Sequence, residues 1–352
     1  MSTVASHKGA GTRPMKPGVI GAVLGVILAV VVTVSFVVLR PSPHQILVVF
    51  PSKDLMFASH IGLVLQNTDI MAQNGIEARF ESADDRDEFD RLATRADVVL
   101  TDQTHALRLS ARPGGAHIVA NLGSAGRVGL VVPVGSPVES IQALRGASIA
   151  SPTGNATHRF LLEQTTSAGL AAGDWELRAS PRLDQSASLG TDAVMLWDPT
   201  LYAAEFQGSV QTLARGEHFA TVTFDDRLVG PHREQGLAVL TAIKQAMHHF
   251  NSDPRQSAIW LAGDTGKPAP QMQRACFRAN GNFGWHRFVS LSMSPELPSL
   301  RTALEADNLY LVSQGYLGTP ADLDRVIDGS LMDSVDIDAE PLASVGTAIP
   351  TP

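Results

Sequence analysis

The sequence predicts an α/β fold with a parallel sheet, preceded by one membrane-spanning helix. Two strand-turn-helix segments carry the α/β prediction. Residues 46–50 (ILVVF) form an apolar run of strand length that a turn and a helical pattern follow, and residues 147–170 repeat this order. The membrane prediction comes from residues 18–39, which are all apolar or small. At 352 residues, the chain has room for one large domain or two ordinary ones.

The N-terminal segment predicts a retained anchor. Residues 1–17 carry three basic residues and no acid, so we expect a flexible cytoplasmic tail. As a helix, residues 18–39 would be about 33 Å long, which spans a bilayer. A cleaved signal peptide has a shorter apolar core of about 7 to 15 residues and ends in small residues, whereas this stretch ends at Leu39, Arg40 and Pro41. We therefore expect a single-pass protein of the cell (inner) membrane with its main domain on the extracytoplasmic, periplasmic side.

Charge and cysteine content exclude some partners. Four basic residues lie within the first 40 positions, so the rest of the chain has 23 of the 27 Lys and Arg against all 35 Asp and Glu, a balance of −12. An acidic domain is a poor binder of nucleic acid. Cys276 is the only cysteine, which permits no internal disulfide and no lipid anchor near the span.

The first part of the domain follows an α/β pattern. We expect strands at 46–50, 75–81 and 97–100, separated by helices at 57–68 and 87–94. Ligands of open α/β sheets bind at the carboxyl ends of strands. The candidate residues at these ends are Ser52, Thr101, Asp102 and Gln103. Ordinary turn chemistry is the alternative interpretation of all four.

The turn of residues 151–155 predicts a helix start that suits an anion. Backbone N–H groups from Gly154 to Thr157 would point along the helix axis, with the hydroxyls of Thr153 and Thr157 nearby. A helix N-terminus carries about half a positive charge. The alternative is that Thr153 or Asn155 only caps the helix.

The remaining elements are expected from periodicity and turn signals. Adjacent histidines at 248 and 249 would face different ways on a helix, so we expect no metal site and no cofactor. A break at 251–254 is expected to divide the long helical region. The further expected strands are 117–121, 128–134 (a crossing between lobes), 174–179, one within 190–199 and one within 216–225; the further helices are 140–146, 183–189, 231–261 and 300–314; and the tail from 336 is expected to be loose.

Residues 140–158 resemble a motif of the substrate-binding proteins of the nitrate/sulfonate/taurine class of ABC importers, roughly S-I-x-D-L-x-G-K-x-I-A-x-P-x-G-S-x-x-H. Ala143 and Asn155 depart from it, and Asp102 is not usual at its place in the family. The segments 190–199 and 314–328 resemble later motifs of the same family, in the same order. The positions that match the first motif are Ser140, Ile141, Leu144, Gly146, Ile149, Ala150, Pro152, Gly154 and His158.

The resemblance implies a two-lobed periplasmic-binding-protein fold of type II. Lobe 1 would comprise 46–132 plus 226–335, and lobe 2 would comprise 133–225. Its function would be capture of a small solute between the lobes for an ABC permease, without chemistry. The implied ligand-binding residues are Ser52, Phe57, Thr101, Asp102, Gln103, Thr153, Gly154, Asn155, Thr157, His158, Asp192, Trp197 and Asp198.

Three alternatives remain open from the sequence. The helix start at Gly154 suits a small anion such as a sulfonate or nitrate, whereas Asp102, Asp192 and Asp198 suit an amine or heterocycle. Fungal pyrimidine-forming enzymes of thiamine synthesis share the implied fold, but they depend on a cysteine-rich segment and iron, so a chain with a single cysteine is expected not to be an enzyme. A ligand-free sensor or scaffold subunit of a membrane complex would use the same fold.

Overall fold

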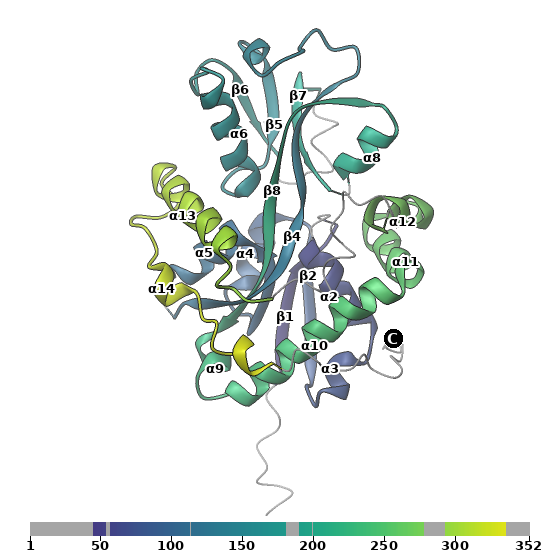
Figure 1. The fold of residues 1–352 in the computed structure, drawn as a ribbon, viewed down its shortest axis with the longest axis vertical. Helices are drawn as coiled ribbons and strands as arrows, with labels where there is room; N and C mark the ends of the chain where they lie inside the picture. The colour runs from purple at the N-terminus through teal and green to yellow at the C-terminus, as the bar shows by residue number, and fades with distance from the viewer. Residues whose placement is uncertain are drawn as a thin grey trace, which may run out of the picture. The chain divides into compact units, whose positions relative to one another are not determined.

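A computed structural model describes residues 45–53, 57–112, 114–180, 190–198, 200–277 and 293–335 (Figure 1). All of them belong to the unit that begins at Gln45. The expected cytoplasmic tail, the membrane span at 18–39, the helix at 183–189 and the tail from 336 lie outside these residues. Within the described part of the chain, no helix is long and apolar enough to cross a membrane.

The described strands form one eight-stranded mixed sheet in the order β2-β1-β3-β8-β4-β7-β5-β6. The outer pairs β1–β2, β1–β3, β5–β6 and β5–β7 are parallel, as expected. The expected parallel sheet does not extend to the centre, because β8 runs antiparallel to β3 and β4, and β4 runs antiparallel to β7. The strands are β1 Ile46–Pro51, β2 Ala78–Ala83, β3 Val98–Asp102, β4 Ala116–Pro133, β5 Ser148–Ser151, β6 Glu176–Ala179, β7 Ala193–Trp197 and β8 Val210–Asp225.

The two central strands are the longest. The expected strands at 117–121 and 128–134 are one strand of 18 residues, β4, and β8 has 16 residues. They are continuous because the residues between the two expected strands also pair with β8, and register shifts near Asn121 and Ser124 absorb the irregular spacing. The ladder extends from the pair Ala116–Asp225 to the pair Pro133–Val210, so it passes through the whole sheet.

Helices cover both faces of the sheet, as an α/β fold requires (Figure 1). Beside β4 and β8, α5 and α13 lie on one side and α10 and α11 on the other; beside β5 and β7, α6 lies opposite α8. The expected helix at 140–146 is only a 3-10 turn, Gln142–Leu144. The helices are α2 Phe57–Asn67, α3 Ile70–Gln73, α4 Arg86–Ala93, α5 Gln103–Ser110, α6 Ala156–Ser167, α8 Thr200–Phe206, α9 Asp226–Val229, α10 Arg233–Ser252, α11 Pro254–Thr265, α12 Ala269–Phe277, α13 Pro298–Ser313 and α14 Leu323–Val326.

The core is divided between the two ends of the sheet. The largest cluster packs α2, α10 and α11 on β1, β3 and β8, with Phe50, Phe224 and Phe250 among its buried side chains. A second cluster packs α6 on β4, β5 and β7 through Phe160 and its neighbours. The fold therefore has two halves, one built on β1, β3 and their helices and the other on β5, β7 and α6. The ladder of β4 and β8 connects them.

Candidate functional site

The carboxyl ends of strands from the two halves meet along β8. Asp102, at the end of β3, pairs with Ala220 of β8. Trp197, at the end of β7, pairs with Val128 of β4, and Val128 in turn pairs with Gly216 of β8. The two ends therefore approach each other along residues 216–220, and we call this region the junction. It is the place where ligands of open α/β sheets bind.

Four buried side chains at or beside the junction carry polar atoms that have no hydrogen-bond partner within the described residues. They are Gln103 Nε2, Thr157 Oγ1, Trp197 Nε1 and both ring nitrogens of His218, and each side chain belongs to a residue at most 2% exposed. Leaving a buried polar group unpaired costs about 1 to 3 kcal/mol. Native structures contain few such groups, so these atoms need a partner that the described residues do not supply, and a bound ligand would supply one.

Gln103 and His218 sit at the centre of the junction. Gln103 opens α5, and its Oε1 accepts a hydrogen bond of 2.7 Å from the backbone N–H of Phe219 on β8. The neighbouring ring of His218 lies 5.3 Å from the ring of Trp197. Burial lowers the pKa of His218 to about 4, so the imidazole is neutral at pH 7 and offers one donor and one acceptor. The sequence did not single out His218, because it lies within a strand pattern.

The helices α5 and α6 begin in the same way on opposite sides of the junction. Asp102, Gln103, Thr104 and His105 start α5, and Asn155, Ala156, Thr157 and His158 start α6. The Asp102 carboxylate accepts from the backbone N–H groups of Thr104 (2.9 Å) and His105 (3.0 Å). The Asn155 side chain accepts from the N–H of His158 at 3.1 Å. Cap, threonine and histidine therefore occupy equivalent positions, but only α5 has a charged cap.

Side chains from α4 and α13 surround the start of α6. The backbone N–H of Gly154 donates to the hydroxyl of Tyr310 at 3.0 Å, and this hydroxyl lies 2.7 Å from His158 Nδ1. The guanidinium of Arg86 donates to the carbonyls of Thr153 and Gly154. Burial, and to a smaller degree the charge of Arg86, lower the pKa of His158 to about 4. Tyr310 and Arg86 belong to no motif and were not expected at this site.

Two of the three expected ligand carboxylates, those of Asp192 and Asp198, are bonded to other groups of the chain. Asp192 accepts from the backbone N–H and the hydroxyl of Ser148, both at 2.8 Å. These bonds lower its pKa. Ser148 begins β5 and Asp192 directly precedes β7, so at 3.3 Å per residue they lie about 10 Å and about 16 Å from the carboxyl ends of these strands. The structure therefore does not bring Asp192 to the junction.

Asp198 lies at the junction but is engaged. Its carboxylate accepts from Arg127 Nε at 3.0 Å and Nη2 at 3.1 Å, and from the backbone N–H of Tyr202 at 3.1 Å. Burial raises the pKa of Asp198, and the bonds from Arg127 oppose that effect. The carboxylate thus holds the start of α8 and the β4 strand together.

The remaining expected residues are mainly in backbone roles. Ser52 is buried, and its N–H donates to the carbonyl of Ala83 at 2.8 Å. Thr101 accepts through its carbonyl from the hydroxyl of Thr221 at 3.3 Å. Phe57 opens α2, and its side chain lies outside the description. Ser52 and Thr101 both lie at carboxyl strand ends, as expected.

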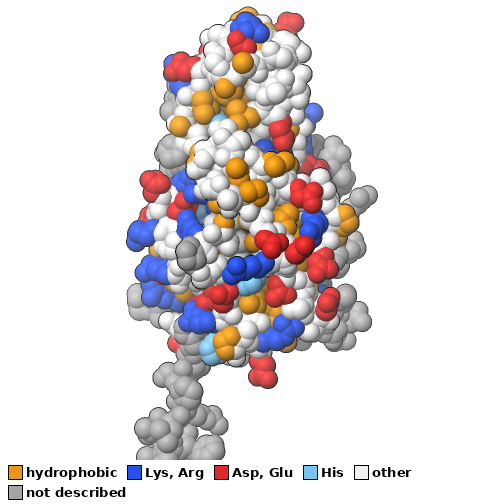
Figure 2. Space-filling view, turned by 90° about the vertical axis from the view of Figure 1, so that its left-hand side faces the viewer, with side chains coloured by type: hydrophobic (Ala, Val, Ile, Leu, Met, Phe, Trp, Pro, Cys, Tyr) orange, Lys and Arg blue, Asp and Glu red, His pale blue; other side chains and the backbone are white. Residues whose placement is uncertain are grey.

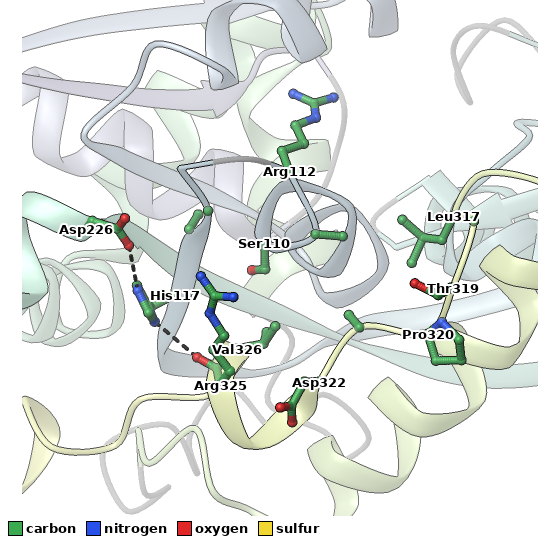
Figure 3. A pocket seen from close by; sticks show the side chains of 15 residues that line it. Ser110, Arg112, His117, Asp226, Leu317, Thr319, Pro320, Asp322, Arg325 and Val326 are labelled. Carbon is green, nitrogen blue, oxygen red and sulfur yellow. Dashed lines mark hydrogen bonds and ion pairs between the residues drawn. The ribbon is translucent and has the colours of Figure 1, made fainter.

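A surface pocket of about 450 Å³ lies elsewhere, between the end of α5, the start of β4 and residues 317–326 (Figure 3). His117 Nε2 contacts Asp226 at 2.8 Å, and His117 Nδ1 lies 3.2 Å from the carbonyl of Arg325. Figure 3 shows the Arg325 side chain directed toward Ser110, and Arg112 extending away from the other labelled side chains. None of the expected site residues lines this pocket. Among the described residues, no group of three or more His, Cys, Asp or Glu could hold a metal ion.

Comparison with known proteins gives one sequence relative and many structures of the same fold. The relative, from Escherichia coli (strain K12), bears the name of an aliphatic sulfonates-binding protein and is 29% identical over 148 residues, which are 40% of this chain and 46% of that protein. The chain thus matches less than half of the relative's length. No family model matches the chain.

Three solved structures illustrate the fold. A periplasmic sulfonate-binding protein from Methylobacillus flagellatus KT has a TM-score of 0.63 at 18% identity, covering 83% of this chain and 94% of that one. The periplasmic aliphatic sulphonate binding protein from Escherichia coli has a TM-score of 0.60 at 18% identity, covering 82% and 92%. The desulfurization enzyme DSZB has a TM-score of 0.60 at 14% identity, covering 82% and 98%. The chain has the α/β fold of periplasmic binding proteins, a fold that also serves an enzyme.

Proposed function

We propose that this chain is a membrane-anchored, extracytoplasmic solute-binding protein of an ABC importer, which captures a small anionic solute of the sulfonate type between two lobes. The lobes are residues 46–132 plus 226–335, and residues 133–225. The strand orders β2-β1-β3-β8 and β6-β5-β7-β4 mirror each other on either side of the centre, which supports two equivalent lobes of the type II fold. The similarity to a sulfonates-binding protein supports the solute class.

The observation that carries the proposal is the set of unpaired polar atoms on Gln103, Thr157, Trp197 and His218. Amide, hydroxyl, indole and imidazole groups all donate hydrogen bonds. Together with the N-terminus of α6, they form a set of donors suited to the oxygens of an anion. A ligand that accepts these bonds would remove the cost of leaving the groups unpaired.

An anion fits this site better than an amine. Asp102 caps α5, and Asp192 and Asp198 are bonded to Ser148 and Arg127. We therefore leave these three carboxylates out of the proposed ligand contacts. A positive group lies beside the start of α6 instead, since Arg86 contacts the loop before it. The site can be locally positive although the exported part is acidic.

The apolar stretch 18–39 supports the anchor, and the three basic residues before it support a cytoplasmic N-terminus. The partner in the membrane would be an ABC permease that accepts the released solute. We propose that the solute is bound and released unchanged, so that mass spectrometry after incubation recovers it intact. Recovery of a chemically changed solute would instead favour an enzymatic function, as in the desulfurization enzyme of the same fold.

The test is a thermal-shift screen of the full chain in detergent against alkanesulfonates, nitrate, bicarbonate, amines and pyrimidines. A solute at about 100 times its Kd stabilises by roughly 2.7 kcal/mol, which raises the melting temperature visibly. Trp197→Phe removes one proposed donor and should weaken the response to a sulfonate. Trp175→Phe is the matched control, because Trp175 Nε1 is also buried without a hydrogen-bond partner among the described residues, but it precedes the edge strand β6. A folded chain that responds to no solute would favour the ligand-free sensor or scaffold.

A further inference from the structure

The helix α13 connects the two halves on one side of the molecule. Its apolar residues Leu300, Leu304 and Leu311 share a core with Ala106 and Leu107 of α5. This packing assigns α13 to the half that contains α5. Figure 2 shows the side of the molecule that carries α5, α6 and α13, with hydrophobic side chains at mid-height and mixed charges below them.

The polar side chains of α13 reach across to α6. The Tyr310 hydroxyl lies within hydrogen-bond distance of both the Gly154 N–H (3.0 Å) and His158 Nδ1 (2.7 Å). One turn earlier on α13, Asp307 accepts from Arg159 Nε at 2.6 Å, and Asp307 is fully buried. We call these bonds from Tyr310 and Asp307 the α13–α6 contact. All of its groups belong to the chain itself, so it forms without a solute.

The fit around this contact is close. Gly154 has φ of +67°, and a Cβ atom added there would lie 2.7 Å from Cζ of Tyr316. The position therefore requires glycine for two reasons, its backbone conformation and the approach of Tyr316. Loss of binding in a Gly154 variant would not by itself show that an anion binds there, since the variant would disturb the α13–α6 contact directly.

The opposite side of the molecule has cross-contacts of a different kind. There Lys267 Nζ lies 3.1 Å from the hydroxyl of Thr200, and the guanidinium of Arg274 lies 5.7 Å from the ring centre of Phe206. Thr200 and Phe206 belong to α8, which packs with the half that contains β7. Phe206 is 53% exposed, so its contact with Arg274 is open to solvent. On the α13 side, by contrast, the carboxylate of Asp307 is fully buried.

We propose that α13 is the closing element of the binding site: Tyr310 and Asp307 hold α6 against α5 before a solute arrives, and solute exchange requires the α13–α6 contact to break. The role of this contact in transport rests on the proposed function. Its role in holding the two halves together does not depend on a solute. A protein-borne contact of this kind sets the ratio of closed to open molecules, and any solute must act on that ratio.

The experiment measures the distance between the halves without any solute. Spin labels on Thr94→Cys, at the end of α4, and Thr166→Cys, in the last turn of α6, would report this distance by double electron–electron resonance in a Cys276→Ser background. Both threonines are exposed and neither belongs to the α13–α6 contact. We expect Tyr310→Phe to raise the ratio of open to closed molecules about tenfold, as lost hydrogen bonds of ordinary strength would.

Tyr316→Phe is the matched control, because that hydroxyl makes no hydrogen bond within the described residues. It should leave the distance distribution unchanged. Asp307→Asn is a second variant that should also lengthen the distance. If Tyr310→Phe and Asp307→Asn both fold and keep the parent distribution, the proposal is overturned. Because no solute is needed, a chain that binds nothing in the screen could still show this closure, so the two proposals fail separately.

Discussion

The starts of α5 and α6 are built from equivalent residues but differ in charge. In both helices a cap residue accepts the N–H of a histidine three positions later, Asp102 for His105 and Asn155 for His158. The carboxylate of Asp102 offsets the partial positive charge at the start of α5. A second carboxylate, that of Asp90, lies 3.2 Å from His105 Nδ1. At α6 the cap is a neutral amide, and the histidine contacts a tyrosine hydroxyl. One helix start is thus already occupied by an anion, and the other is left positive.

This difference teaches how the same local structure can serve stability in one half and binding in the other. A helix N-terminus has backbone N–H groups that lack partners within the helix. In α5 the chain supplies the negative partner itself. In α6 it supplies none within the described residues, and the hydroxyl of Thr157 is left unpaired as well. This difference favours the start of α6 as the place where the proposed solute binds.

The largest effect is expected from giving α6 the cap of α5. Asn155→Asp places a carboxylate beside the proposed anion, and two like charges about 4 Å apart repel by about 4 kcal/mol at an effective dielectric constant of 20. We expect sulfonate affinity to fall at least about 100-fold by isothermal titration. Thermal stability should be kept, because aspartate caps helices as well as asparagine does. Asn155→Ser is the neutral control, and unchanged affinity in Asn155→Asp would contradict the assignment.

Acidification should destabilise the fold through buried histidines. Burial lowers the pKa of His60 and His105 to about 3 and that of His158 and His218 to about 4, against about 6.5 when unfolded. The unfolded chain therefore binds more protons, and stability is lost as the pH falls from about 6.5 toward about 4. Each histidine should cost about 2 kcal/mol between pH 7 and pH 5. Burial raises the pKa of Asp307 to about 6, which acts in the opposite direction by costing stability as the pH rises.

Urea denaturation at pH 7, 6 and 5 would measure this loss. The variant His158→Gln should reduce the loss of unfolding free energy between pH 7 and pH 5 by the contribution of one histidine. His105→Gln should reduce it by a similar amount, which compares the two helix starts directly. A fold equally stable at pH 7 and pH 5 would mean that these rings are not held neutral.

A smaller effect is expected at Thr157 and Thr104, which occupy equivalent positions in α6 and α5. Thr157→Val removes a buried hydroxyl that is unpaired in the described structure, so we expect unchanged or slightly higher thermal stability. If that hydroxyl donates to the solute, affinity should fall about tenfold, the value of a hydrogen bond to a charged group. The equivalent change in α5, Thr104→Val, should leave affinity unaltered. Equal losses in both variants would show that the two helix starts do not differ as proposed.

The smallest effect is expected from removing the charge at α5. Asp102→Asn keeps the cap hydrogen bonds but loses the charge interaction with the helix, which typically contributes about 0.3 to 1 kcal/mol. We expect a loss of stability of about that size in urea denaturation and little change in sulfonate affinity. A loss of several kcal/mol would show that the carboxylate does more than complete the helix start.

The fold was largely accessible from the sequence because its signals are local. The run ILVVF, the cap before α6 and the Asp253-Pro254 break each specify an element boundary by themselves, and the structure confirms all three. The union of 117–121 and 128–134 into β4 was not accessible, because it depends on pairing with β8, nearly a hundred residues later in the chain. Non-local pairing leaves no local periodicity to detect.

The site was only partly accessible for the same reason. Gln103, Thr157 and Trp197 were expected because they follow strands or motifs, and the structure places them at or beside the junction. His218 and Tyr310 come from the interior of a strand and of a helix, and only the register of β8 and the packing of α13 bring them there. Asp198 is expected from the sequence to contact a ligand, but Arg127, from the distant β4, donates hydrogen bonds to its carboxylate. Which members of the expected set contact a solute stays a prediction.

The continuous ladder of β4 and β8 has a consequence for biosynthesis. β4 leaves the ribosome before the whole segment that makes β5, β6 and β7, whereas β8, which completes the sheet between β3 and β4, leaves after it. During synthesis, the edges of β3 and β4 that pair with β8 therefore stay unpaired until β8 has emerged. Such edges are prone to aggregation. We expect a nascent chain stalled before residue 210 to depend on chaperones, and one stalled well beyond residue 225 to depend on them much less.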